Sequence, residues 1–199
     1  MAGKSSKTEA SMNHTKKIAL ITLFFAFIFT ENIFSIGAGA QIGAIPSIDI
    51  DENGVNFKDF EGNLTGTVHL FRIPAVFGFG VNIGKDSFDK DNDNSDFVLG
   101  LAGFFDYWIS EIQLENIWNL YTGFGFYGKV MMDFDKNFTA SLGPRFFVGT
   151  NWLFIDNYVE YYAQMNVVPT YVTSLTDFAG KSGKFRLCLP LEIGVRLHF

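Results

Sequence analysis

Apolar residues recur at every second position over long stretches of this 199-residue chain. The C-terminal segment shows the pattern best: apolar side chains occupy alternate positions from Phe185 to Phe199, while Arg186, Glu192 and Arg196 lie between them. A period of two is the signature of a β-strand whose two faces meet different surroundings. After the first 35 residues no convincing helical period occurs. The sequence therefore predicts an all-β fold.

The alternation predicts eight strands. Between Leu64 and Ile83 the apolar positions change from even to odd numbers, and Pro74, which cannot donate to a β-ladder, lies at the change. Since a continuous strand cannot switch faces without a bulge or turn, we expect two strands in this stretch. The expected strands are 35–45, 64–72, 75–84, 97–109, 117–131, 139–152, 157–172 and 184–199.

The connections between these strands alternate in kind. Those after the first, third, fifth and seventh strands are polar, mostly longer and rich in Asp, Asn and Gly, and span 47–63, 85–96, 133–137 and 174–183. The other connections are shorter or less charged. Long loops on one side and short turns on the other are typical of an antiparallel, up-and-down transmembrane β-barrel of the bacterial outer membrane.

Residue size predicts which face points into the barrel. The chain contains 24 Phe and 20 Gly, and the glycines fall on the polar face of the strands. An eight-stranded barrel is barely wide enough inside for side chains, so small residues belong in the lumen and bulky ones point outward. A charge facing lipid costs about 2–4 kcal/mol at mid-bilayer, and the strand charges share the small-residue face. We therefore expect outer-membrane lipid around the barrel.

Aromatic residues are concentrated near the expected short turns. Trp108, Trp118 and Trp152 lie beside these turns, together with Tyr107 and Tyr158. Tryptophan and tyrosine are enriched where a membrane meets water. We expect these five residues to form an aromatic girdle at the periplasmic interface, although ordinary strand packing would explain any one of the tryptophans.

The N-terminal segment has the charged, apolar and polar order of a secretory signal peptide. Two lysines precede the apolar run 18–29, which is shorter than the roughly 20 residues that a spanning helix needs. A buried helix or an anchor is the alternative. We expect a signal peptide over 1–35, cut near Ser35, and a barrel domain over 36–199; Met12 is a second candidate for the start of translation.

The mature part of the sequence resembles the small outer-membrane barrel superfamily of the OmpA, OmpX and OmpW type. The most specific element is the last strand, in which alternating apolar residues end with Val195, Leu197 and a terminal Phe199. In that family such an ending resembles the signal that the barrel-assembly machinery reads. The resemblance implies this machinery as a partner during biogenesis, and the outer membrane of a double-membraned bacterium as the location.

Charged side chains on the small-residue face define the candidate lumen site. They are Asp106, Lys129, Arg145, Glu160, Arg186, Glu192 and Arg196, with Asp106 expected nearer the periplasmic end. Because unpaired buried charges are heavily penalised, we expect Glu192 to pair with Arg196 and Arg145 with Glu160. A salt-bridged plug is one outcome of such pairing, and a narrow or gated small-solute channel is the other.

A short acidic motif raises the question of metal binding. Asp49, Asp51, Asn53 and Gly54 match the opening of a calcium loop, but its closing position is occupied by Phe60 rather than a carboxylate. An acidic, solvated loop is therefore the main interpretation, and we predict neither metal nor other cofactor.

Other functional classes receive less support. The net charge of −6 and the pI near 5.0 argue against nucleic acid as a partner. His69 and His198 have no evident nucleophile partner, so we expect no enzymatic activity. We predict a non-catalytic outer-membrane barrel that is structural or conducts small solutes. The alternative is a surface adhesin whose acidic extracellular loops bind a host or small-molecule ligand.

Overall fold

The structure, a computed structural model, describes residues 36–51, 54–70, 73–85, 97–132, 138–175 and 183–199. Every element in these segments is a strand: β1 (Ile36–Asp51), β2 (Gly54–Leu70), β3 (Ala75–Lys85), β4 (Phe97–Glu115), β5 (Trp118–Met132), β6 (Phe138–Phe154), β7 (Val159–Ser174), β8 (Lys184–Cys188) and β9 (Leu191–His198). No helix in the described segments is long and apolar enough to cross a membrane. The predicted signal peptide, 1–35, lies outside the described residues.

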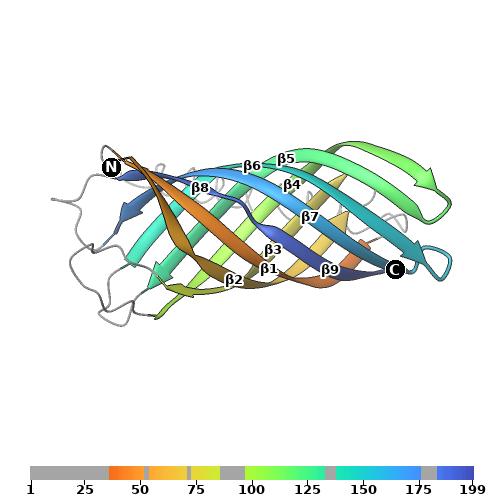
Figure 1. The fold of residues 1–199 in the computed structure, drawn as a ribbon. Coiled ribbons are helices and arrows are strands. Elements are labelled where there is room, and N and C mark those ends of the chain that lie inside the picture. Colours follow the sequence, from red (N-terminus) through yellow and green to blue (C-terminus); the bar gives the residue numbers. More distant parts are fainter. Residues whose placement is uncertain (1–35, 52–53, 71–72, 86–96, 133–137, 176–182) are drawn as a thin grey trace, which may run out of the picture. The chain divides into compact units, whose positions relative to one another are not determined.

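The strands form a closed antiparallel ring (Figure 1). Each strand from β1 to β7 pairs with the next in sequence, and β1 closes the ring by pairing with β8 and β9. β8 and β9 together make the eighth position in the wall, because both also pair with β7. The prediction of an eight-stranded, up-and-down barrel is therefore confirmed.

The eighth strand is interrupted at Leu189 and Pro190. Proline lacks the N–H that a ladder needs. Around the interruption, the backbone N–H and the side-chain Nδ2 of Asn166 both donate to the carbonyl of Pro190, at 2.8 and 3.1 Å. The backbone N–H of Leu189 donates to the Pro46 carbonyl at 2.9 Å. These bonds keep the wall continuous where the regular ladder stops.

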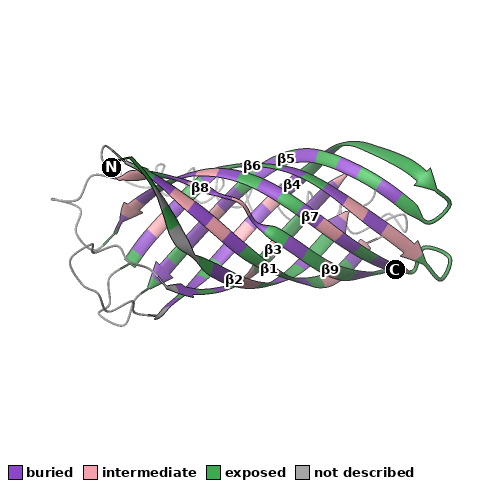
Figure 2. Cartoon of the chain, viewed as in Figure 1, coloured by how far each residue is buried: buried purple, intermediate pink, exposed green. Residues whose placement is uncertain are grey.

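Successive residues along each strand point to opposite sides of the wall (Figure 2). In β5 buried and exposed residues alternate over nearly the whole strand. The outward residues are bulky and apolar, and Phe79, Phe126 and Leu142 are 60–68% exposed. The inward residues are mainly small, polar or aromatic. The predicted assignment of the two faces is thus confirmed.

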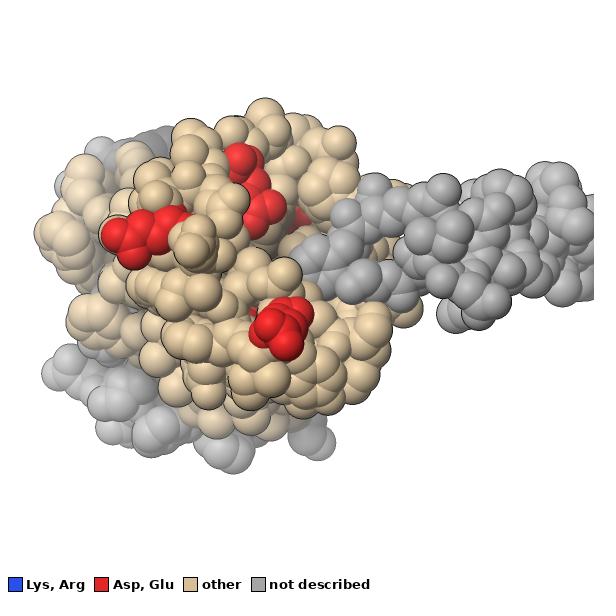
Figure 3. Space-filling view, turned by 90° about the vertical axis from the view of Figure 1, so that its right-hand side faces the viewer, with Lys and Arg blue, Asp and Glu red and all other residues tan. Residues whose placement is uncertain are grey.

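The two ends of the barrel differ. The C-terminus and the turns at 73–74, 116–117 and 155–158 lie at one end, which we call the short-turn end. Figure 3 views the molecule from this end. The other end, the long-loop end, is where β1, β3, β5 and β7 finish. The connections 86–96, 133–137 and 176–182 there lie outside the described residues.

Two strand pairs are longer than the alternation predicts. β1 continues to Asp51, and β2 already begins at Gly54. The polar stretch 47–63 therefore forms a hairpin, and its prediction as a loop is wrong. The register shift opposite Ile45 and Ser47 displaces β2 by one residue, whereas the inward phase of β1 continues through the buried Ile45, Ser47 and Asp49. β4 likewise runs on to Glu115 through a similar shift.

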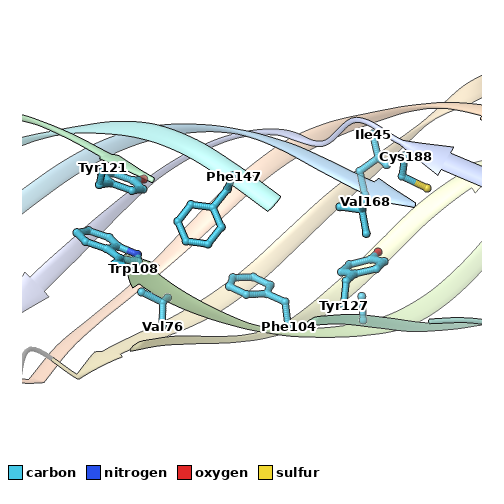
Figure 4. Packing of buried hydrophobic residues seen from close by; sticks show 10 residues of the cluster. Ile45, Val76, Phe104, Trp108, Tyr121, Tyr127, Phe147, Val168 and Cys188 are labelled. Carbon is cyan, nitrogen blue, oxygen red and sulfur yellow. The ribbon is translucent and has the colours of Figure 1, made fainter. Parts of the chain in front are cut away.

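Apolar side chains fill parts of the lumen (Figure 4). One group contains Trp108 and Tyr121, whose rings stack with centroids 4.0 Å apart, and Phe147, whose ring centroid is 6.2 Å from that of Tyr121. A second group, seen apart from the first in Figure 4, contains Val168 and Tyr127. The lumen is therefore a packed core, as expected for a ring of this size.

Glycines make this packing possible. Gly149 lies between Tyr121 and Gln164 in the register of β5, β6 and β7. A Cβ on Gly149 would lie 2.4 Å from the ring of Tyr121. The Tyr121 hydroxyl crosses above the glycine and donates to Gln164 Oε1 at 3.0 Å. The missing side chain on the middle strand thus lets the side chains of its two neighbours meet.

We predict that Gly149→Val destabilises the barrel. The added side chain overlaps the ring of Tyr121 and breaks its bond to Gln164, at a cost of about 1–3 kcal/mol. Urea unfolding in lipid vesicles measures the change. Gly128→Ala is the matched control, since its Cβ meets only Leu142 at 3.5 Å. Equal stability of the two variants would contradict this account of the lumen glycines.

Candidate functional site: the charged lumen

The lumen holds a set of buried ion pairs. The alternation along each strand points these charged side chains inward, and the small residues beside them leave room for them. The register between the strands brings them together. Its acidic members are Asp49, Glu61, Asp106, Glu160 and Glu192, and its basic members are Lys129, Arg145, Lys184, Arg186 and Arg196. All are buried except Lys184, which is partly exposed. Each carboxylate has a basic partner within 3.0 Å, so the buried charges are compensated.

Arg145 is the centre of the first cluster and is completely buried. Its Nε lies 2.9 Å from Asp106 Oδ1, and its Nη2 lies 2.5 Å from Glu192 Oε2. Gln164 donates to Asp106 at 3.1 Å and Asn166 donates to Glu192 at 2.9 Å. The carboxylates are thus held by amide groups as well as by the guanidinium, which is what a stable buried ion pair requires.

The register explains how Arg145 reaches Asp106 across an intervening strand. Gly125 on β5 lies between Asp106 on β4 and Arg145 on β6. A Cβ on Gly125 would lie 2.6 Å from Asp106 Oδ1. The same arrangement recurs at Gly43, where Asn63 on β2 donates to Glu192 on β9 at 3.1 Å. Bridges over glycine thus connect alternate strands of the wall.

A second cluster surrounds Glu160 near the short-turn end. Nη1 of Arg196 lies 3.0 and 3.1 Å from the two Glu160 oxygens. His198 Nε2 and Asn151 Nδ2 also bond to this carboxylate, at 3.0 and 2.9 Å. The guanidinium of Arg196 lies over the ring of Tyr162, 3.7 Å from its centroid. Stacking and ion pairing together fix this arginine.

A third cluster lies toward the long-loop end. Lys129 Nζ is 2.6 Å from Glu61 Oε2, and Arg186 Nε is 2.6 Å from Asp49 Oδ1. Lys184 is 3.0 Å from the other Asp49 oxygen, and Arg186 approaches Glu61 at 3.9 Å. Two carboxylates and three cations are therefore linked across β1, β2, β5 and β8.

The structure places all seven predicted lumen residues inside the barrel, but both predicted pairs are wrong. Glu192 pairs with Arg145 rather than Arg196, because residues four apart on one strand are too far apart to meet. Arg196 instead pairs with Glu160, which lies directly opposite in the register. Asp106 joins the Arg145 cluster.

Sequence reasoning missed Glu61 and Asp49 as lumen residues. Both lie in the stretch that was expected to be a loop. The sequence did contain a signal for Glu61. Asn63, Thr65 and Thr67 are polar residues at every second position, and Glu61 continues this series on the same face. The same kind of signal was present for Asp49, which is in phase with the buried Gln41 and Ser47 of β1.

Two of the candidate calcium ligands, Asp49 and Asp51, belong to strand β1. Asp49 lies within β1 and its carboxylate is bonded to Arg186 and Lys184. The side chain of Asp51 and the whole of Asn53 lie outside the described residues. Within the part of the chain that the structure describes, no group of His, Cys, Asp and Glu is placed to hold a metal ion.

Four of the five predicted girdle residues are at least partly exposed on the outer wall. Tyr107, Trp118 and Tyr158 are 37–44% exposed, and Trp152 stacks on Trp118 with ring centroids 6.5 Å apart. The placement of Trp108 in the girdle is wrong. It shares the inward phase of β4 with Asp106, is only 5% exposed and stacks on Tyr121 in the lumen.

The predicted assembly signal lies on the outer face of β9 and at its end. Val195 and Leu197 point outward, and Phe199 exchanges backbone hydrogen bonds with Ile36 at the closing seam of the ring. Their recognition by the assembly machinery stays a prediction.

Comparisons with known proteins bear on the fold. No family profile matches the sequence, and no curated protein matches it as a relative. Neisserial surface protein A has a similar structure, with a TM-score of 0.51 at 14% identity over 82% of this chain and 97% of that protein. The fold is that of a small outer-membrane β-barrel.

Two further solved structures give lower scores. The barrel matches Ail, the attachment invasion locus protein of Yersinia pestis, with a TM-score of 0.39 at 11% identity over 83% of this chain and 99% of that one. It matches a major outer membrane protein from Thermus thermophilus with a TM-score of 0.40 at 12% identity, over 81% and 99% of the respective chains.

We predict that the barrel depends on charge compensation at Arg145. Arg145→Met leaves Asp106 and Glu192 buried without a cation, which should cost about 3–5 kcal/mol in free energy of unfolding. Urea titration of the variant in vesicles measures the loss. Adding Asp106→Asn and Glu192→Gln removes the stranded charges and should restore most of the stability. A triple variant no more stable than Arg145→Met would contradict the prediction.

Proposed function

We propose that this protein is an integral outer-membrane barrel that reaches the membrane through secretion, with residues 1–35 as its signal. The observation that carries the proposal is the inversion of the two faces. Large apolar side chains cover the outer wall, whereas the described strand charges point into the lumen or lie at the short-turn end. A soluble barrel would have the reverse arrangement, since an apolar outer wall is stable only against lipid.

The proposed orientation has the short-turn end in the periplasm. Outer-membrane barrels have short periplasmic turns and longer external loops. The exposed aromatics Trp118 and Tyr158 lie near the short turns, where an interfacial girdle is expected. In this orientation the connections 86–96 and 176–182 face the outside of the cell.

Within the membrane we propose a closed barrel without catalytic activity. The charge clusters are paired, and the Trp108 and Tyr127 groups occupy lumen space as well. Both described histidines have structural surroundings: His198 bonds to Glu160, and His69 packs against Trp108 at 4.6 Å. A structural role therefore has the better support, and a narrow channel requires the ion pairs to exchange partners.

A surface-binding role is the second candidate. The β1–β2 hairpin at the long-loop end carries Val55, Phe57 and Phe60, which are 63–83% exposed. Exposed aromatic residues of this kind are common anchors in binding interfaces. A host or small-molecule ligand that docks on this hairpin or on the acidic loops would make the protein an adhesin.

Membrane embedding is tested by the position of single tryptophans. In vesicles of lipids with brominated acyl chains, a variant that keeps only Trp118 should lose most of its fluorescence. A variant that keeps only Trp108 should keep its fluorescence, because the ring lies in the lumen behind the wall. Equal quenching of the two tryptophans, or none of either, would overturn the proposed embedding.

Conduction is tested by reconstitution. We expect purified barrels in planar bilayers to show no large, stable single-channel conductance and little solute flux in liposomes. Flux should stay low when residues 86–96 are replaced by a short Gly-Ser linker. Steady conductance in the wild-type protein would favour the channel. The adhesin would be favoured by two results together: flux stays low, and the protein binds a ligand or cells in a way that Phe57→Ser abolishes.

A further inference from the structure

A groove crosses the outer wall of the barrel beside the aromatic residues of the short-turn end. It has a volume of about 630 Å³, and its lining comes from β1, β5, β6, β7 and β9. These five strands are consecutive neighbours in the wall (Figure 1). We call this feature the wall groove. Its volume lies within the range of small-molecule sites, which are about 300–1,000 Å³.

Small outward residues form the centre of the wall groove. Ala163 on β7 and Thr150 on β6 lie opposite each other in the register, and both are half-buried. Leu120 and Ile193 continue the same row on either side and are 39% and 58% exposed. Large side chains therefore stand on both sides of a low centre. Here the wall departs from its usual cover of bulky apolar residues.

The polar groups of the lining are bonded elsewhere. The hydroxyl of Thr150 accepts from Nε1 of Trp118 and donates to the Asn119 carbonyl at 2.9 Å. Gln164 and Glu192 also line the groove, but their side chains bond within the lumen. A ligand in the wall groove is therefore held by packing alone. Such a surface suits a hydrocarbon chain.

The wall groove starts at the level of the aromatic girdle. Trp152 and Tyr161 pair in the register, and Thr150 and Ala163 follow two residues further from the short-turn end. The amphipathic rings of tryptophan and tyrosine lie at the level of lipid headgroups. In the proposed orientation the groove therefore leads from the headgroups of the periplasmic leaflet toward the middle of the bilayer.

The position and shape of the wall groove favour a lipid over a second barrel. The groove is continuous with the wall that faces lipid. Two convex barrels would touch along a narrow strip, whereas stable protein interfaces bury about 1,200–2,000 Å². An acyl chain is thin enough to lie between Leu120 and Ile193. Because lipid tails are as apolar as the wall, association in a membrane depends on close packing, which small residues allow.

We propose that the wall groove binds one acyl chain of a phospholipid from the periplasmic leaflet. The chain lies over Ala163 and Thr150, and the headgroup lies beside Trp152 and Tyr161. This site rests on the membrane embedding and the orientation proposed above. It does not depend on whether the lumen conducts.

The test measures how much lipid stays bound to the protein purified from membranes in mild detergent. Titrated with palmitoyl-oleoyl phosphatidylethanolamine, the protein should retain one lipid per barrel in native mass spectrometry. Ala163→Phe fills the centre of the wall groove and should weaken retention about tenfold, through lost van der Waals contacts. Ala44→Phe fills the groove from β1 and gives a second reading if Ala163→Phe does not fold.

Ala140→Phe is the matched control. Ala140 is another outward, half-buried alanine of the wall, but it lies outside the wall groove. Its replacement should change lipid retention less than about twofold. Heat-modifiable gel migration confirms that each variant is folded. Equal retention by the wild type and the groove variants would overturn the proposal, and so would a wild-type mass of two chains without lipid.

A failure of this site can be told apart from a failure of the proposed function. Quenching of Trp118 by brominated lipids, together with equal lipid retention by all variants, would leave the barrel embedded and overturn only the lipid site. Absence of this quenching would overturn the embedding and the lipid site together.

Discussion

The narrow lumen of an eight-stranded ring is the constraint on which the rest of this structure depends. Neighbouring strands cannot all send large side chains inward, because the interior has no room for them. The chain meets this limit by placing glycine between two larger residues, as Gly125 lies between Asp106 and Arg145. Each such gap lets side chains two strands apart bond to each other. The ring is thus braced from inside as well as by its ladders.

The same constraint decides what the lumen charges can do. Arg145, Glu160 and Lys129 have almost no access to solvent, so each must find its counter-charge within the barrel. Amide and hydroxyl groups complete the bonding of the lumen side chains. The result is a lumen in which polar clusters and aromatic groups share the available space.

The alternation of residues predicted the fold and the inward set of charges, because a period of two assigns each residue to one face. It could not predict which charges pair, since that depends on the register between strands. The stretch through Asp49 keeps the alternation of β1, but its content of Asp, Asn and Gly made it look like a loop. The five aromatic residues were grouped by nearness to turns, although Trp108 has the inward phase. Bridges over glycine offer a usable signal, because Gly125 and Gly43 both lie between residues that bond.

The closing seam has a consequence for how the molecule is made. Gly37, at the start of the barrel, pairs with His198, next to the end of the chain. Contacts between residues so distant in sequence are slow to form and require the whole segment between them. Until β9 is present, β1 and β7 each lack a partner along about half of one edge. Such open edges readily pair with other chains. The order of synthesis therefore leaves the growing chain exposed to aggregation until its last strand is complete.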